Sequence, residues 1–140
     1  MNKLKLTGNQ TQASKFFLNG HRCSEAILKS YGPSVGLPES LAMKIGCALG
    51  GGLGSTRNLC GAVSSAIIVL GLIFGRESES DQLSKDKTNQ IISQFVEKFL
   101  STFQSLNCND LLNLDEDICP RLVQEATKIL DEIIAKEKKF

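Results

Sequence analysis

Residues 62–74 read AVSSAIIVLGLIF, and this stretch decides the fold. It lies between Arg57 and Arg76, and no charged residue stands between those two arginines. A membrane-spanning helix needs about 20 predominantly apolar residues, whereas this run is shorter and is interrupted by two serines and a glycine. A helix that is apolar on every side is normally buried in a protein core. We therefore expect a fully buried central helix over residues 59–75, and no membrane insertion.

Amphipathic helices are predicted on the C-terminal side of this stretch. Residues 84–106 carry apolar side chains at intervals of three or four residues, which is typical of a helix with one buried face. These side chains are Ile92, Phe95, Phe99, Phe103 and Leu106. Residues 107–118 indicate a short turn or helical fragment. Pro120 favours the start of a last helix, whose inner side is predicted to hold Leu122, Ala126, Ile129 and Ile133.

Two helical segments are predicted on the N-terminal side. The first places Phe16, Gly20, Cys23 and Ile27 on one face; Asn19-Gly20 weakens its middle and can divide it in two. Tyr31-Gly32-Pro33 ends this segment, because proline cannot continue a helix. The second begins near Pro38 and is predicted to bury a stripe of Leu41, Ile45 and Ala48.

Alternating strand patterns are essentially absent, so the predicted fold class is all-α: a bundle of about five helices forming a single domain over residues 1–140. The 140 residues carry a net charge of +1, with basic and acidic residues interleaved. This balance does not favour nucleic acid or an anionic membrane surface as a partner. A homo-oligomer is compatible with the sequence.

Five cysteines are the feature that points to function. No secretion signal is visible at the N-terminus, so we expect a cytoplasmic protein whose thiols are kept reduced. Cys47, Cys60, Cys108 and Cys119 lie at or near predicted helix ends, where side chains from different helices can converge, and Cys23 lies on the first predicted helical segment. Cysteine often merely fills space in a core, but core filling gives no reason to prefer helix termini.

Cys60 is the candidate attacking thiolate. If Asn58 caps the following helix, Cys60 falls in the first turn, where unpaired backbone N–H groups lower a thiol pKa. The glycine-rich segment over residues 50–54 precedes it and would let a small ligand or a second sulfur approach. An anion-binding loop is the alternative interpretation of these glycines, but neither a Walker lysine nor a preceding strand is present.

Cysteine spacing separates the kinds of metal site. Structural zinc usually uses close cysteine pairs, and none occurs here. Dispersed thiolates remain compatible with an iron–sulfur cluster and with metal-free thiol–disulfide exchange. A third alternative is a non-catalytic helical module that binds a partner or small ligand. His21 would lie on nearly the opposite helix face from Cys23, so we expect a solvated side chain rather than a ligand.

Several blocks of the chain resemble the C_GCAxxG_C_C family of redox-active proteins. Residues 21–28, HRCSEAIL, resemble the N-C-A-x-A-V-L opening of that family. The other blocks occur in the family's order over nearly the whole chain: residues 50–54 with 60–63 and 70–72, residues 103–112, and residues 119–130. Ser65 departs from the pattern, since it stands where CGAxxG has its last glycine. The segment between Cys108 and Cys119 is also shorter than in the family.

The resemblance implies a small helical redox or metal-binding protein. Its recurrent cysteines map onto Cys23, Cys60, Cys108 and Cys119, and Cys47 fits the motif in the family's name. The leading hypothesis is that these four thiolates bind an iron–sulfur cluster, or another thiolate-ligated metal, for electron transfer with a redox partner that the sequence does not name.

Overall fold

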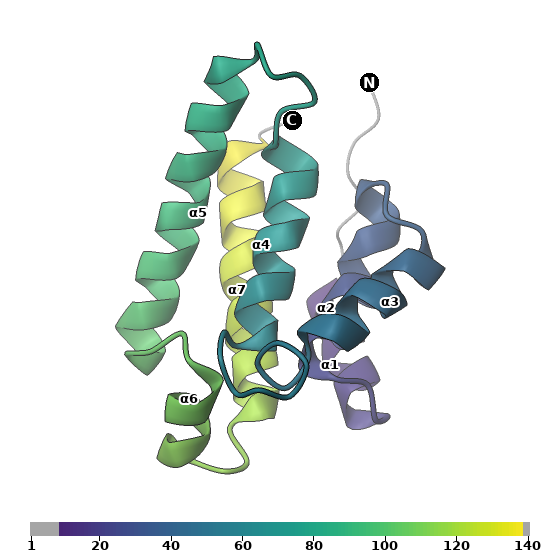
Figure 1. Ribbon diagram of the computed structural model, residues 1–140, viewed down its shortest axis with the longest axis vertical. Helices are drawn as coiled ribbons and strands as arrows, with labels where there is room; N and C mark the ends of the chain where they lie inside the picture. The colour runs from purple at the N-terminus through teal and green to yellow at the C-terminus, as the bar shows by residue number, and fades with distance from the viewer. Residues whose placement is uncertain (1–8, 139–140) are drawn as a thin grey trace.

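Seven α-helices and one 3-10 helix make up the part of the computed structural model that is described, residues 9–138 (Figure 1). They are α1 (Asn9–Leu18), α2 (Cys23–Tyr31), η1 (Gly32–Val35), α3 (Glu39–Leu49), α4 (Gly61–Phe74), α5 (Gln82–Phe103), α6 (Cys108–Leu114) and α7 (Cys119–Glu137). No strand occurs among these residues, so the all-α prediction is confirmed. The predicted number of about five helices is wrong. The N-terminal segment forms two helices, and the fragment after α5 forms a helix of its own.

The break between α1 and α2 lies at the Asn19-Gly20 position that the sequence marks. Gly20 has a φ of 99°, a left-handed conformation that ends α1 at little cost in a glycine. Arg22 caps α2, since its backbone N–H donates a hydrogen bond to Glu25 Oε1 at 2.8 Å. Cys23 therefore becomes the first residue of α2. At the other end, Gly32 and Pro33 begin the 3-10 helix, as the predicted stop requires.

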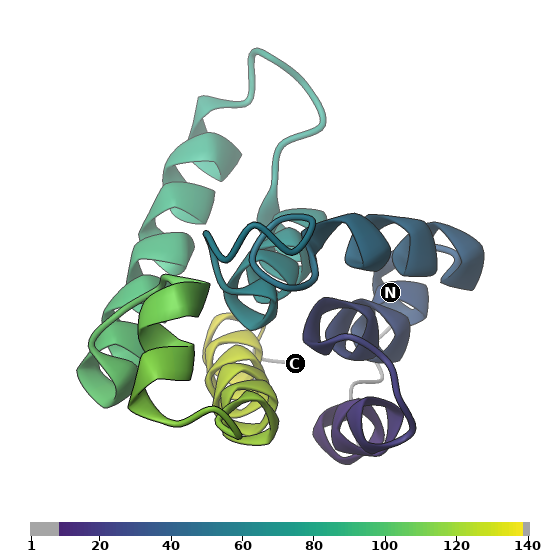
Figure 2. The same ribbon diagram turned by 60° about the horizontal axis from the view of Figure 1, so that its bottom comes forward.

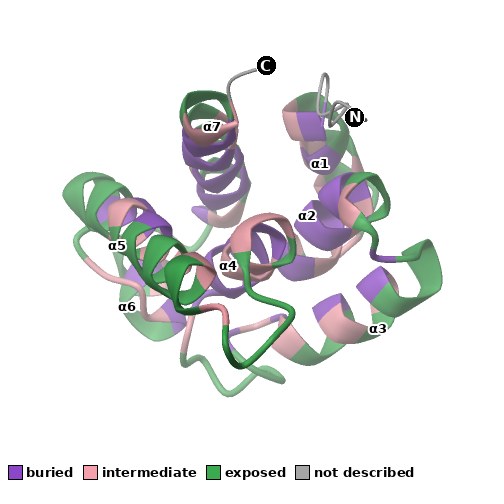
Figure 3. Cartoon of the chain, turned by 90° about the horizontal axis from the view of Figure 1, so that it is seen from above, coloured by how far each residue is buried: buried purple, intermediate pink, exposed green. Residues whose placement is uncertain are grey.

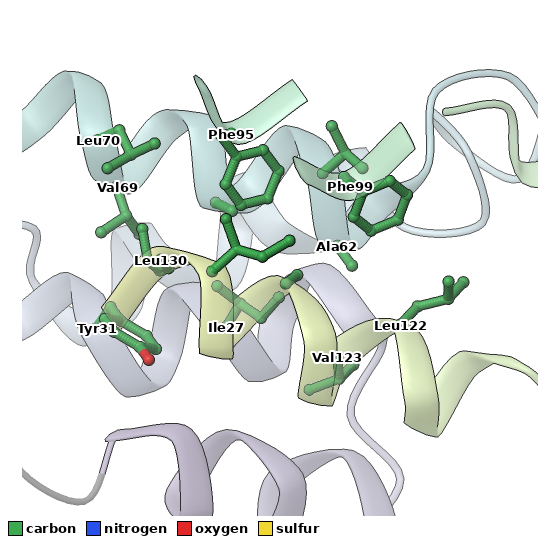
Figure 4. Packing of buried hydrophobic residues seen from close by; sticks show 14 of the residues in the cluster. Ile27, Tyr31, Ala62, Val69, Leu70, Phe95, Phe99, Leu122, Val123 and Leu130 are labelled. Atoms are coloured by element: carbon green, nitrogen blue, oxygen red, sulfur yellow. The ribbon is translucent and has the colours of Figure 1, made fainter. Parts of the chain in front are cut away.

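The core is shared by several helices rather than centred on one. Helix α4 packs against α2, α5 and α7, and α7 packs against α1, α2, α4 and α5. Seen from above, the buried faces of α2, α4 and α7 turn toward one another (Figure 3). The side chains labelled in Figure 4, such as Ile27 of α2, Leu70 of α4, Phe99 of α5 and Leu130 of α7, meet between these helices.

Helix α4 is less completely buried than the apolar run predicts. Its first ten residues are mostly enclosed, but Leu72 near its end is 44 % exposed. No helix within residues 9–138 is long and apolar enough to cross a membrane. Ser65, which replaces a motif glycine, is fully buried and donates a hydrogen bond to Gly61 O at 2.6 Å. The serine hydroxyl is thus satisfied within its own helix, and close packing is retained.

The buried face of α3 differs from the predicted stripe. Ala42 and Gly46 are buried, whereas Leu41 is 46 % exposed and Ala48 is also exposed. A Cβ on Gly46 would lie 2.7 Å from the Cα of Glu25, so α2 and α3 approach closely enough to exclude any side chain there. Ile45 of the predicted stripe is partly buried and packs against the core, but the close approach of α3 to α2 is made at Gly46.

Helix α5 begins slightly earlier than predicted and has its own cap. Asp81 Oδ1 accepts a hydrogen bond from the backbone N–H of Ser84 at 3.0 Å, which makes this carboxylate an N-cap rather than a free loop charge. The helix buries Ile91 together with Phe95, Phe99 and Phe103, and Ile92 is only partly buried. Asp115, Glu116 and Asp117 are exposed.

A buried polar pair joins α2 to α7 and leads to a pH-dependent prediction. The hydroxyl of Tyr31 donates a hydrogen bond to Asp131 Oδ1 at 2.6 Å. Burial raises the pKa of Asp131, with the hydrogen bond from Tyr31 opposing it. In the range between the ordinary and the raised pKa, the folded state binds a proton more readily than the unfolded state. Lowering the pH through this range therefore favours folding.

The substitution Asp131→Asn removes this titrating group. We expect wild type to gain stability relative to the variant as the pH falls, with a slope of at most about 1.4 kcal/mol per pH unit for one proton. Urea unfolding of both proteins at a series of acidic to neutral pH values measures the difference. Parallel curves would contradict the assignment to Asp131.

Candidate functional site

Four cysteines occupy the beginnings of four helices. Cys23, Cys108 and Cys119 are the first residues of α2, α6 and α7, and Cys60 is the N-cap of α4. The beginnings of α4, α6 and α7 lie at the lower end of the bundle in Figure 1, which comes forward in Figure 2. We call Cys23, Cys60, Cys108 and Cys119 together the four-thiol site. The sequence places Cys60, Cys108 and Cys119 near helix ends and Cys23 within the first helical segment, whereas the structure shows that all four are at N-terminal ends.

Cys60 and Cys108 are brought together by a short antiparallel pairing. Leu59 and Asn107 form the bridge. The backbone N–H of Cys60 donates to Leu106 O at 2.8 Å, and the N–H of Cys108 donates to Asn58 O at 2.6 Å. Each cysteine follows one of the two bridge residues, so the two side chains lie on the same face of the pairing and are diagonal neighbours. Segments about 50 residues apart in the chain thereby contribute to one site.

Two glycines allow the sulfur atoms to come close to other backbone segments. A Cβ on Gly61 would lie 2.8 Å from the sulfur of Cys23, so only glycine at this position lets that sulfur pack against the beginning of α4. A Cβ on Gly52 would lie 2.7 Å from the Cβ of Cys108. The close approach predicted at the glycine-rich segment is thus made, at Gly52, by the side chain of Cys108.

Residues 50–58 form a tight loop with an unusual backbone. Five successive residues, 51–55, have positive φ values between 59° and 75°, and two of them, Leu53 and Ser55, are not glycine. Backbone N–H groups of residues 53–58 are bonded to carbonyl oxygens within α3 and the loop itself. Because these donors are already used, the anion-binding interpretation of the loop is not supported.

Arg22 fastens the loop to the beginning of α2. Its guanidinium lies across Gly50, where a Cβ would collide with Arg22 Cδ. Its Nη2 donates to Ser55 Oγ at 3.1 Å, and its Nη1 donates to Cys47 O at 3.4 Å. The residue next to Cys23 in the chain thus fixes the loop that leads to Cys60. The sequence pattern gave no sign of this role.

Electrostatic coupling shows that the four thiols share one region. Burial is the largest cause that raises the pKa of Cys23 to about 12, and the charges of Cys60, Cys119 and Cys108 add to it. Burial also raises the pKa of Cys119, again with a contribution from Cys108. The charges of neighbouring thiols therefore disfavour ionisation of Cys23 and Cys119, as expected for like charges in a poorly solvated region.

The expectation of an acidic Cys60 thiol is wrong for the metal-free protein. Burial raises the pKa of Cys60 to about 11, while the backbone N–H groups of Val63 and Ala62 at the beginning of α4 lower it. The helix N-terminus therefore acts as predicted, but only 2 % of Cys60 is exposed and burial outweighs it. Asn58 is not the helix cap; its carbonyl oxygen pairs with Cys108 instead.

Cys47 and His21 lie outside this set. Cys47 is exposed on α3, and no coupling joins it to the four thiols within the described chain. His21 precedes α2 and is half-buried, so the prediction of a solvated side chain is wrong. Its ring packs on Phe16 with centroids 5.2 Å apart, and its Nδ1 is 3.0 Å from Phe16 O. This environment is structural.

The four thiols are not arranged as the ligands of a single metal ion. Among residues 9–138, no three His, Cys, Asp or Glu side chains stand close enough to hold one metal ion. No disulfide is formed among these residues either, since all five cysteines are free thiols. The site is thus a group of neighbouring, mostly buried thiols that influence one another without direct bonds.

The difference in exposure predicts an order of thiol modification. We expect iodoacetamide to modify Cys47 first at about pH 8, and Cys23 and Cys60 at least tenfold more slowly, because Cys60 is buried, Cys23 is partly buried, and the pKa of each of these two thiols lies well above that pH. Peptide mapping by mass spectrometry after timed alkylation of the reduced protein measures the order. Faster modification of Cys60 than of Cys47 would mean that Cys60 is accessible and ionised.

Comparison with known proteins agrees with this arrangement. A family model described as "Putative redox-active protein (C_GCAxxG_C_C)" matches residues 21–133, a span that contains all four thiols of the site. Searches of curated proteins and of solved structures found no match. Because the family model covers most of the chain, this protein belongs to the C_GCAxxG_C_C family.

Proposed function

We propose that the protein is an electron-transfer protein whose four-thiol site binds an iron–sulfur cluster. The observation that carries this proposal is that four helices begin with a cysteine, with Cys60 and Cys108 held together by the pairing of Leu59 and Asn107. Four ionised thiols would repel one another in a buried region, and a cationic group between them removes that repulsion. The family description, redox-active, fits such a group.

A cluster fits the donor set better than a single ion does. Four cysteine thiolates are the usual ligands of iron–sulfur clusters, and the ligands need not be close in sequence. A single zinc ion needs its ligands in a tight tetrahedron, whereas no three candidate ligands of residues 9–138 are that close. Thiols that interact electrostatically, but are too far apart to share one metal ion, are expected around a larger, polynuclear group.

The chain's own residues have three tasks at such a site. Cys23, Cys60, Cys108 and Cys119 provide the thiolates. The backbone N–H groups of Ala62 and Val63 stabilise negative charge on the Cys60 sulfur. The surrounding apolar residues, including Leu111 and Ile118, limit access of water. An iron–sulfur cluster, when bound, supplies one-electron redox chemistry, and its potential depends on these hydrogen bonds and on burial.

Metal-free thiol–disulfide exchange is a second candidate, favoured by the diagonal placement of Cys60 and Cys108. In that reaction the two thiols form one S–S bond and lose two electrons and two protons. The disulfide bond of a partner molecule accepts the two electrons and two protons and is cleaved to two thiols. The raised pKa of Cys60 disfavours this candidate, because the thiolate is the attacking species.

Anaerobic reconstitution with ferrous iron and sulfide tests the two candidates. A cluster protein becomes coloured and retains both iron and sulfide in stoichiometric amounts after desalting. A colourless protein that retains neither would contradict the proposal. Treating that protein with oxidised glutathione would then distinguish the alternatives: a reversible Cys60–Cys108 disulfide supports thiol exchange, and unchanged thiols support a helical module whose cysteines serve packing alone.

A further inference from the structure

Arg57 is a cation at the four-thiol site that has no role in the function proposed above. Its Nη1 donates a hydrogen bond to Cys108 Sγ at 3.9 Å. Its positive charge also acts on Cys119, where it lowers the pKa of the thiol and so favours the ionised form. No carboxylate forms an ion pair with Arg57 in the described part of the chain. The charge of this arginine is therefore directed at sulfur rather than neutralised by an acidic side chain.

The backbone holds Arg57 in this place. Its N–H donates to Gly51 O at 2.9 Å, and its carbonyl oxygen accepts a hydrogen bond from the N–H of Asn109 at 3.2 Å. The second bond joins Arg57 to the residue after Cys108. Arg57 has a φ of 63°, a left-handed conformation that costs a non-glycine residue about 1–2 kcal/mol. Strained conformations of this kind persist where the surrounding structure enforces them, and they cluster at functional sites.

We propose that Arg57 is the charge-compensating residue of the four-thiol site: it holds the Cys108 sulfur by a hydrogen bond and offsets negative charge on Cys108 and Cys119. This inference rests on the proposed function for its effect on a cluster, but the placement of the cation beside the sulfurs does not. A thiolate-ligated cluster becomes more negative on reduction, so a nearby cation stabilises the reduced form and raises the reduction potential.

The first experiment measures the reduction potential of the reconstituted protein. We expect Arg57→Gln to shift the potential to more negative values and Arg57→Lys, which keeps the charge, to retain most of the wild-type value. Arg76→Gln is the matched control, because Arg76 is exposed in the connection between α4 and α5, where it donates to Glu79 O at 2.9 Å. An Arg57→Gln protein with the wild-type potential would overturn the proposal.

The second experiment uses the reduced, metal-free protein. Iodoacetate is negatively charged and iodoacetamide is neutral, yet both attack the same thiolate, so the ratio of their rates does not depend on how far the thiol is ionised. We expect Arg57→Gln to lower this ratio at Cys119 roughly three- to fivefold at low salt, and to leave the ratio at Cys47 unchanged. An unchanged ratio at Cys119 would overturn the placement of the cation.

The two experiments fail independently. If the protein binds no cluster but the rate ratio at Cys119 falls in Arg57→Gln, the proposed function is wrong and the role of Arg57 at the sulfurs remains. If a cluster forms and neither the potential nor the ratio responds, the proposed function remains and the role of Arg57 is wrong. Circular dichroism of each variant verifies that the helices are intact.

Discussion

Replacing Gly46 by alanine is expected to destabilise the protein by about 2 kcal/mol. The added Cβ would lie 2.7 Å from Glu25 Cα and 2.9 Å from Glu25 N, and backbone atoms cannot move aside as the end of a side chain can. Helices α2 and α3 would have to separate. This cost exceeds the gain of about 1 kcal/mol that alanine normally brings to a helix interior.

Gly71→Ala is the matched control for that substitution. Gly71 is also a helical glycine, but no atom of the described structure outside its own helical neighbourhood lies within 4 Å of the position its Cβ would take. Only the helix propensity changes there, so we expect this variant to be stabilised by up to about 1 kcal/mol. Urea unfolding followed by circular dichroism measures both. Opposite signs support the close contact of α2 and α3, and a stabilised Gly46→Ala would refute it.

Replacing Cys60 by alanine is expected to abolish cofactor binding while leaving the fold intact. Cys60 is the N-cap of α4, and its thiol interacts electrostatically with Cys108 and Cys119. The variant therefore lacks the most buried of the four proposed ligands. Removing one small buried group costs on the order of 1 kcal/mol, which a domain of this size tolerates. Iron and sulfide analysis after anaerobic reconstitution measures the effect.

Cys47→Ala provides the control for nonspecific binding of iron by thiols. Cys47 is exposed on α3 and uncoupled from the four-thiol site, so this variant should retain the wild-type iron content. If Cys60→Ala retains as much iron as Cys47→Ala does, then Cys60 is not a ligand. If both variants lose iron, then Cys47 belongs to the site and the assignment of four ligands is incomplete.

The local features of this fold follow from the sequence, because they depend on near neighbours in the chain. Asn19-Gly20 divides the first helical segment, Pro33 ends the second helix, and Pro120 lies in the first turn of α7, as predicted. The spacing of Phe95, Phe99 and Phe103 identifies the buried face of α5. Each of these features results from a backbone preference or a periodicity that a window of a few residues contains.

Features that depend on contacts between distant segments were not predictable in the same way. Hydrophobicity selects Leu41 and Ile45 on α3, but the face that packs on α2 is set by how closely Gly46 lets two backbones approach. Asn58 has the properties of a helix cap, yet its carbonyl oxygen is used by Cys108, which is 50 residues later in the sequence (108 − 58). The same pairing places Arg57 beside a sulfur atom, which no local pattern indicates.

The four cysteines remain the predicted site residues, whereas the electrostatics expected at Cys60 is wrong. Helix N-termini do direct N–H groups at Cys60, but the sequence could not show that the same residue is 2 % exposed and close to other thiols. Burial and like charge together outweigh the helix. A thiol that is a poor nucleophile without metal can still be a good ligand, since a bound cation replaces the proton.

Iron K-edge X-ray absorption of the reconstituted protein is the most direct test that four thiols form one ligand set. We expect a first shell of sulfur alone around iron in wild type and in Cys47→Ala, since the proposed ligands are four cysteine thiolates and the other atoms of the cluster are sulfide. Nitrogen or oxygen neighbours in the first shell of wild type, or the same spectrum from a protein lacking Cys23, Cys60, Cys108 and Cys119, would contradict the account.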